Sequence, residues 1–277
     1  MTGEQRSPKD SFITVYGRMP VLEVLQDDSL AVDKVVVAEG SRGDSLERIR
    51  VLARRRGIAV RTASAHRVKV LAGNGKHDQG VLADVVPPRM ALVEDFVQRP
   101  SSGPGTAGSD TVLVLDAVSN PANVGMILRT ATAAGIAGIV LPRVGSPGVG
   151  PLVVKASAGI AYQAPILRCR TAADGVRTLR DAGWRVAGLD AGAPADLYAT
   201  DLPAATALVL GNETRGVSGE VADLVHTWVS IPMAGGVDSL NVSTAAAVVC
   251  FELLRRRLRA ERGEAPGRQR DQGGARR

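Results

Sequence analysis

The stretch LVLGNETRGVS (residues 208–218) joins an apolar run directly to a loop of glycine and polar residues. Two other segments have the same build: VLVLDAVSNPANVGMILRTATAAG (residues 112–135) and VSIPMAGGVDSLNVS (residues 229–243). Buried parallel strands read as continuous apolar runs, and ligands bind beyond the carboxyl ends of such strands. The three segments therefore predict an α/β fold with a parallel sheet and a ligand site at its loops.

The composition is that of a globular protein with a basic surface. The chain has 277 residues, 45% of them hydrophobic, which is enough for one large or two modest domains. No run approaches the roughly 18 apolar residues that span a bilayer, and the polar N-terminus lacks a signal core, so we expect a cytoplasmic protein without membrane contact. The net charge of +6 favours a polyanionic partner such as RNA, with a solvated arginine-rich surface as the alternative.

Cysteine and histidine give no sign of a metal site. Cys169 and Cys250 are far apart and lack pairing or metal-ligand spacing, so we expect both to be small buried residues. The three histidines are scattered as well, and we expect no metal.

Composition shifts divide the chain into five parts. We expect a disordered leader (1–11), a small N-terminal α/β domain (12–97), a Pro/Gly/Ser linker (98–110), a second α/β domain (111–262) and a disordered basic tail (263–277). The linker contains G-x-G-x-x-G, but this fingerprint is meaningful only between a strand and a helix, and here it precedes the strand. We therefore discount a nicotinamide-dependent oxidoreductase, which would rest on these glycines alone.

Strands and helices alternate in both domains. In the first, a strand and a glycine turn lead into a helix near Pro20, and residues 91–97 add one or two helical turns. Many basic side chains crowd this domain, either as a solvated helix face or as an RNA-docking surface: Arg42, Arg48, Arg50, Arg54, Arg55, Arg56, Arg61, Arg67, Lys69 and Lys76. The remaining strands are expected at 32–38, 58–61, 80–86, 112–116, 136–141, 165–168, 184–189, 207–210 and 227–231. The remaining helices are expected at 45–56, 65–71, 151–159, 172–182 and 243–259. A further helix is expected after residues 112–116, where Val124, Ile127, Leu128 and Ala131 recur with helical spacing.

The loop after residues 112–116 carries the first candidate side chains. Asn123 is expected to cap the following helix. Ala122 and Gly125 share a helix face with Arg129 and leave room beside its guanidinium, which can lean back toward the strand ends. The alternative is that Arg129 pairs with a surface carboxylate.

The other two loops add polar groups at strand ends. Asn212 and Glu213 follow an apolar run directly, and Pro232 forces the chain to leave the sheet. The polar residues 239–243 then enter a helix, where simple N-capping is the alternative to a functional role, and is favoured for Ser243.

Together, NPANVGMILRTA (120–131), LGNETRGVS (210–218) and SIPMAGGVDSLNVSTAAA (230–247) resemble the three motifs of the SpoU (TrmH-type) RNA 2'-O-ribose methyltransferases of the SPOUT superfamily. YGRMPVLEVL (16–25) and HDQGVLADV (77–85) resemble, more loosely, the substrate-binding domain of the subgroup that methylates guanosine in large-subunit rRNA. The resemblance implies a parallel sheet with a deep C-terminal trefoil knot, an N-terminal domain like ribosomal protein L30e, bound S-adenosylmethionine, and a homodimer with its C-terminal and first-motif helices near the interface.

The resemblance also implies roles for individual residues. The cofactor pocket would be lined by Leu189, Gly211, Asn212, Ile231, Pro232, Met233, Leu240 and Asn241. The catalytic residues facing RNA would be Asn123, Arg129, Glu213, Ser239 and Asn241. The family's first-motif arginine has been proposed as the base, but a guanidinium stays protonated in proteins. We expect Arg129 instead to bind the phosphate beside the target ribose, and Glu213 to orient partners.

Two readings within this fold stay open. The substrate is either rRNA, which the added N-terminal domain favours, or tRNA. A non-catalytic RNA-binding or ribosome-assembly factor of the same fold is the second alternative, against which the intact Asn123, Arg129, Glu213 and Asn241 count.

Overall fold

The computed structural model describes residues 10–73, 78–99, 111–203 and 205–263. The core of the predicted linker, nearly all of the leader and tail, and Lys76 lie outside these ranges. Within the described ranges, no helix combines the length and apolarity needed to cross a membrane.

The N-terminal domain is a four-stranded sheet with helices packed on it, as the sequence predicts. The strand order is β1-β4-β2-β3, with β4 antiparallel to both β1 and β2, and β3 parallel to β2. The elements are β1 (Ile13–Tyr16), α1 (Arg18–Gln26), β2 (Ala31–Ala38), α2 (Asp44–Arg55), β3 (Ala59–Ala63), α3 (Ala65–Ala72) and β4 (Val81–Val86). β2, α2, β3, α3 and β4 each lie within two residues of their expected bounds, and α1 begins near Pro20 as expected.

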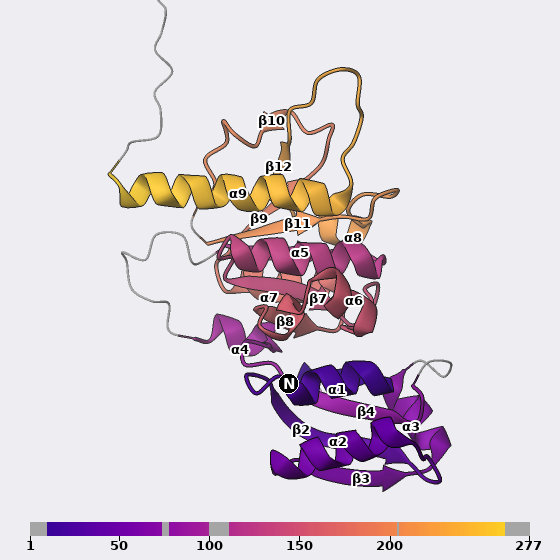
Figure 1. Ribbon diagram of the computed structural model, residues 1–277. Coiled ribbons are helices and arrows are strands. Elements are labelled where there is room, and N and C mark those ends of the chain that lie inside the picture. The colour runs from indigo at the N-terminus through magenta and orange to yellow at the C-terminus, as the bar shows by residue number, and fades with distance from the viewer. Residues whose placement is uncertain (1–9, 74–77, 100–110, 204, 264–277) are drawn as a thin grey trace, which may run out of the picture.

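The second domain is built on an eight-stranded, fully parallel sheet, in the order β10-β12-β9-β11-β6-β7-β8-β5 (Figure 1). Its strands are β5 (Ala91–Leu92), β6 (Val112–Leu115), β7 (Gly138–Pro142), β8 (Ile166–Cys169), β9 (Arg185–Leu189), β10 (Ala195–Asp196), β11 (Thr206–Leu210) and β12 (Thr227–Ser230). Its helices are α4 (Val93–Val97), α5 (Pro121–Ala133), α6 (Pro151–Ala156), η2 (Ile160–Tyr162), α7 (Ala172–Asp181), α8 (Gly219–Ala222) and α9 (Val242–Glu261). The parallel α/β fold is thus confirmed.

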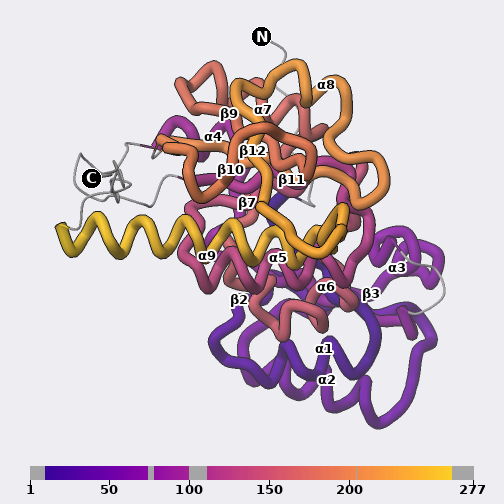
Figure 2. The backbone as a smooth tube through the Cα atoms, turned by 90° about the horizontal axis from the view of Figure 1, so that it is seen from above, coloured from indigo at the N-terminus to yellow at the C-terminus, as the bar shows by residue number. Residues whose placement is uncertain are grey.

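Helices cover both faces of this sheet because successive strand residues point to opposite sides. Leu113 and Leu115 of β6 are buried in one apolar cluster with residues of α5, α6 and α9. Val112 and Val114 are buried in the other, with residues of α4, α7 and α8. On the first face α9 lies along α5, and Figure 2 shows it running well past the end of that helix.

Residues 91–97 contact the second sheet, although we expected them at the end of the N-terminal domain. β5 pairs in parallel with β8 as the edge strand of the eight-stranded sheet. Val93 is fully buried in the cluster with α7, and the Phe96 ring centroid lies 5.8 Å from that of Trp184. The sequence analysis also missed β10 and α8, since segments of two to four residues have too little periodicity to be recognised.

Both cysteines are buried and unpaired, as expected. Burial raises the pKa of each thiol to about 12. Both thiols therefore stay neutral, and that of Cys169 also donates to the carbonyl of Thr171 over 3.1 Å.

Candidate functional site

A pocket opens at the carboxyl ends of β9, β11 and β12, where the sequence predicts a ligand site. It is lined by the residues that follow these three strands and by the first turn of α9. The lining residues are Leu189, Asp190, Ala191, Leu210, Gly211, Asn212, Glu213, Gly216, Ile231, Met233, Ser239, Leu240, Val242 and Ala245. Eight of the twelve predicted site residues are among them; Pro232, Asn241, Asn123 and Arg129 are not.

Two hydrogen bonds hold the loop after β11 against the loop after β6. The backbone N–H of Ser218 donates to the buried carboxylate of Asp116 over 2.6 Å. The Asn212 side chain donates to the carbonyl of Ala117 over 3.0 Å. Ala117 has φ of 55°, an uncommon conformation for a residue with a side chain. These contacts fix the second motif relative to the first.

The loop at residues 211–216 folds back on itself. The backbones of Asn212 and Gly216 exchange two hydrogen bonds of 2.9 Å, and the Asn212 carboxamide oxygen accepts from the N–H groups of Thr214 and Arg215. A Cβ on Gly211 would lie 2.3 Å from the carbonyl carbon of Gly216, so only glycine permits this turn. Asn212 therefore shapes the loop, and Glu213 projects from it as an exposed side chain.

Three motif side chains form one polar chain at the edge of the pocket. The Asn123 amide donates to the carboxylate of Glu213, in a short hydrogen bond. The Asn241 amide donates to the Asn123 oxygen over 3.2 Å. Residues from all three predicted loops are thus brought together, although Asn123 and Asn241 do not line the pocket itself.

The capping assignments from sequence were wrong at both helices. Asn120, not Asn123, caps α5 by accepting from the N–H of Ala122, which leaves Asn123 inside the first turn and free to reach Glu213. Asn241, not Ser243, caps α9, and the Ser243 hydroxyl donates to the Asn241 oxygen over 2.6 Å. In each case the residue nearest the loop takes the cap, because its backbone is still extended.

Arg129 is exposed on α5, and its side chain makes no hydrogen bond or ion pair with another described residue. The space left by Gly125 does not serve it. A Cβ on Gly125 would lie 2.6 Å from both the Ala156 side chain and the Val153 carbonyl oxygen, so this glycine lets α6 pack closely against α5. The predicted role of Gly125 in clearing the Arg129 face was therefore wrong.

The basic residues of the N-terminal domain separate into two groups. Arg56 donates to the carbonyls of Val24, Leu25, Asp27 and Leu30, and so closes the end of α1. Arg50 pairs with Glu47 on its own helix over 2.6 Å. The other described residues among the basic side chains that the sequence singled out are exposed: Arg42, Arg48, Arg54, Arg55, Arg61, Arg67 and Lys69.

Sequence reasoning missed six lining residues: Asp190, Ala191, Leu210, Gly216, Val242 and Ala245. Asp190 had a usable signal, since it follows an apolar strand directly, as Asp116 does. The apolar members carried none, because their contribution depends on how the loops meet. Within the described ranges, no group of His, Cys, Asp and Glu is arranged to hold a metal ion.

Comparison with known proteins agrees with this arrangement. Residues 110–251 match the SpoU rRNA Methylase family, and residues 14–91 match the domain described as RNA 2'-O ribose methyltransferase substrate binding. A 23S rRNA (guanosine-2'-O-)-methyltransferase RlmB of Xanthomonas axonopodis pv. citri is 36% identical over 89% of this chain and 97% of its own length. A putative TrmH family tRNA/rRNA methyltransferase of Staphylococcus aureus is 34% identical over 88% of this chain and 96% of its own.

Solved structures have the same fold. The AdoMet-bound rRNA methyltransferase of Sinorhizobium meliloti superimposes with a TM-score of 0.59 at 26% identity, covering 89% of this chain and 88% of its own. A putative TrmH-family RNA methyltransferase of Porphyromonas gingivalis superimposes with a TM-score of 0.59 at 27% identity, covering 90% of this chain and 91% of its own. Two family domains in the expected order, and relatives that align over nearly their whole length, lead to one conclusion: the chain belongs to the SpoU rRNA methylase family.

Proposed function

We propose that this chain transfers the methyl group of S-adenosylmethionine to a ribose 2'-hydroxyl of rRNA, with 23S rRNA as its substrate. The observation that carries the proposal is the chain of hydrogen bonds from Glu213 through Asn123 to Asn241, which joins all three family motifs beside one pocket. The relative that is named a 23S rRNA (guanosine-2'-O-)-methyltransferase supports the choice of rRNA. The N-terminal substrate-binding domain supports it too, since folded rRNA offers a large surface to dock on.

The pocket residues fit S-adenosylmethionine. Leu189, Leu210, Ile231, Met233 and Leu240 supply apolar walls, while Asp190, Asn212 and Ser239 add polar groups at its margin. Such a mixture is typical of small-molecule sites, where a few polar groups fix the orientation. Bound there, the cofactor supplies an electrophilic sulfonium methyl.

The protein's task is then to align the ribose. We assign Glu213 to orient the 2'-hydroxyl, because its carboxylate borders the pocket and is held by Asn123. Asn241 fixes Asn123 in turn, and its own orientation is set by capping α9. Positioning of this kind can lower a barrier by about 7–11 kcal/mol. We assign Arg129 to the phosphate beside the target ribose, since an exposed, always-charged guanidinium suits that contact.

We also propose that the active form is a homodimer with a knotted catalytic domain. Exposed apolar side chains on the first sheet face support the dimer: Met126 of α5 is 40% exposed, and Phe251 and Leu258 of α9 are 51% and 40% exposed. Exposed apolar side chains on two neighbouring helices are suited to contact a second copy of the chain. The knot is proposed from the resemblance of the three motifs to those of the SPOUT superfamily.

Equilibrium binding of S-adenosylmethionine tests the proposal directly, since the non-catalytic alternative predicts no productive cofactor site. We expect the wild-type protein to bind S-adenosylmethionine. In a second experiment, we expect Arg129→Lys to bind RNA normally but to methylate it slowly. Arg177→Lys, an exposed change on α7, is the matched control. An Arg129→Lys enzyme with full rate would remove Arg129 from the mechanism.

A further inference from the structure

The long connection between β9 and β11, residues 190–203, forms one wall of the pocket and continues well beyond it. Its first residues make a tight turn, in which the N–H of Ala193 donates to the carbonyl of Asp190 over 3.2 Å. The chain then pairs with β12 through β10, and Leu197 is completely buried. Asp190 and Ala191 line the pocket, so the position of this segment sets the position of the wall.

A second turn follows at residues 196–200. The N–H and hydroxyl of Thr200 both donate to the carbonyl of Asp196, over 2.9 and 2.7 Å, and the Asp196 carboxylate accepts from the N–H of Tyr198. Such a turn leaves the carbonyls of Leu197 and Thr200 without partners inside the segment. Both are instead bound by one side chain from α9.

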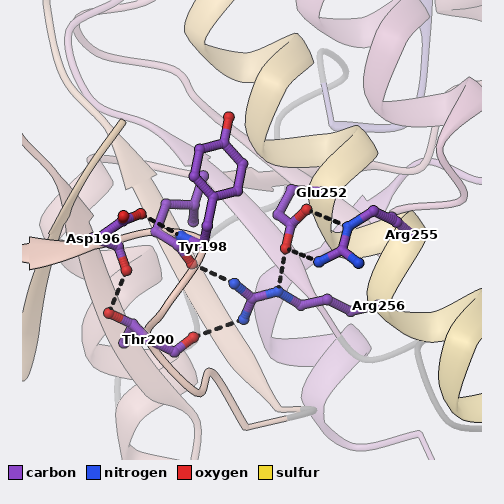
Figure 3. A network of polar contacts seen from close by, with 7 residues as sticks. Asp196, Tyr198, Thr200, Glu252, Arg255 and Arg256 are labelled. Atoms are coloured by element: carbon purple, nitrogen blue, oxygen red, sulfur yellow. Dashed lines mark hydrogen bonds and ion pairs between the residues drawn. The ribbon is translucent and has the colours of Figure 1, made fainter. Parts of the chain in front are cut away.

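That side chain is Arg256. Its guanidinium donates to the carbonyl of Thr200 over 2.7 Å and, through its other terminal nitrogen, to that of Leu197 in a short hydrogen bond. Its Nε donates to the carboxylate of Glu252 over 2.7 Å, so all three nitrogen atoms of the guanidinium donate a hydrogen bond (Figure 3). A planar guanidinium is suited to hold two carbonyls and a carboxylate at once, which a lysine cannot do.

Glu252 fixes the orientation of Arg256. Its side chain is 5% exposed and also accepts two hydrogen bonds from Arg255, over 2.7 and 2.8 Å. Figure 3 shows that Arg255 approaches Glu252 from the side away from the 196–200 turn. The two arginines thus share one carboxylate, but only Arg256 links α9 to the connection.

The two segments that Arg256 joins are both walls of the pocket. One is the 190–203 connection, which lines the pocket with Asp190 and Ala191, and the other is α9, which lines it with Val242 and Ala245 of its first turn. α9 is one continuous helix from that turn to Arg256, with a rise of about 1.5 Å per residue. A displacement of the helix at Arg256 therefore also displaces its first turn. A link between the segments therefore constrains the width of the pocket.

We propose that Arg256 is a positioning residue for the methyl-donor site, which holds the 190–203 connection against α9 and so sets the affinity for the cofactor. This inference rests on the proposed function. Arg256 touches neither the pocket nor the polar chain of Glu213, Asn123 and Asn241. Its removal is therefore expected to weaken cofactor binding while the alignment of the ribose is retained.

The test compares Arg256→Ala with Arg255→Ala in the full chain. Arg255→Ala is the matched control, since it removes the other partner of Glu252 and leaves the connection bound. For Arg256→Ala we expect the Kd and KM for S-adenosylmethionine to rise about tenfold, equivalent to about 1.4 kcal/mol, with kcat at saturating cofactor and RNA affinity unchanged. Arg256→Lys should lie between the wild type and Arg256→Ala.

Hydrogen exchange gives a readout that is independent of turnover. In the cofactor-free protein, the amides of Leu197 and Thr200 should exchange faster in Arg256→Ala than in Arg255→Ala or the wild type. Unchanged exchange and cofactor affinity in Arg256→Ala, or equal losses in both variants, would overturn the inference. If the wild-type protein itself fails to bind S-adenosylmethionine, the proposed function fails instead, and the exchange comparison still decides whether Arg256 holds the connection.

Discussion

The side-chain amide of Asn123 donates a hydrogen bond to the carboxylate of Glu213, although 90 residues separate the two along the chain. Asn123 is buried inside the first turn of α5, so its orientation is fixed by the sheet packing beneath it. Glu213 lies on an exposed loop and has no comparable support of its own. The buried residue therefore positions the exposed one, and the geometry of the second motif depends on the first.

Replacing Asn123 with alanine should slow the methyl transfer without affecting cofactor binding. Asn123 does not line the pocket, but Glu213 and Asn241 would both lose a partner. A displacement of about 1 Å at a reacting group can cost about 100-fold in rate, and we expect kcat to fall by that order. The rate of single-turnover methylation at saturating S-adenosylmethionine measures this loss.

Asn120→Ser is the control for Asn123→Ala, because serine also caps a helix and Asn120 makes no contact with Glu213. Full activity in Asn123→Ala would show that the polar chain has no part in the reaction.

Asp116→Ala should loosen the loop of the second motif. The buried carboxylate accepts from the backbone N–H of Ser218, and this is one of the two hydrogen bonds that hold the loop against the loop after β6. We expect a loss of about 1–3 kcal/mol in the free energy of unfolding, together with weaker cofactor binding. Urea denaturation and isothermal titration measure the two effects. A variant that unfolds at a lower urea concentration but binds the cofactor normally would contradict the proposed link between this contact and the pocket.

Gly125→Ala should destabilise the protein by about 1–3 kcal/mol, because the new methyl group would meet backbone and Ala156 of α6. Gly219→Ala is the matched control: it also lies in a helix, and a Cβ added there would have nothing within 4 Å. Thermal unfolding of both variants tests the close packing of α5 and α6. Equal stability of the two variants would mean that α6 moves away at little cost.

The network around Glu252 should make stability depend on pH in the acid range. Burial alone would raise the pKa of Glu252, but hydrogen bonds and charge from Arg255 and Arg256 outweigh it and lower the pKa below its ordinary value of 4.5. The stabilisation is thus complete above about pH 4.5 and is lost as the pH falls through the lowered pKa. We expect Glu252→Gln to be less stable than the wild type near neutral pH, with the difference shrinking in acid. A difference that stays constant with pH would contradict the assignment.

The sequence predicted those helices and strands whose buried side chains follow a repeating local pattern of apolar residues. Val124, Ile127, Leu128 and Ala131 follow the period of a helix, and all four are completely buried on α5. The apolar run of β6 is likewise buried throughout, as continuous apolar strands in parallel sheets are. In these cases one residue pattern decides the burial of each side chain, and no distant contact is needed.

The partners of the site residues could not be predicted in this way. Asn123 was recognised as a site residue but assigned to a cap, because its bonds to Glu213 and Asn241 span 90 and 118 residues. Arg56 looked like its exposed neighbours in sequence, and only the path of α1 makes it a structural group. Local patterns cannot reveal which distant carbonyl or amide will come within hydrogen-bonding distance.

Methylation of total RNA with labelled S-adenosylmethionine, followed by mapping of the modified nucleotide, tests the central claim most directly. We predict label on the 2'-oxygen of a ribose in 23S rRNA, and its loss in Asn123→Ala. Label on a base, or the absence of any labelled RNA with a protein that binds the cofactor, would contradict the account.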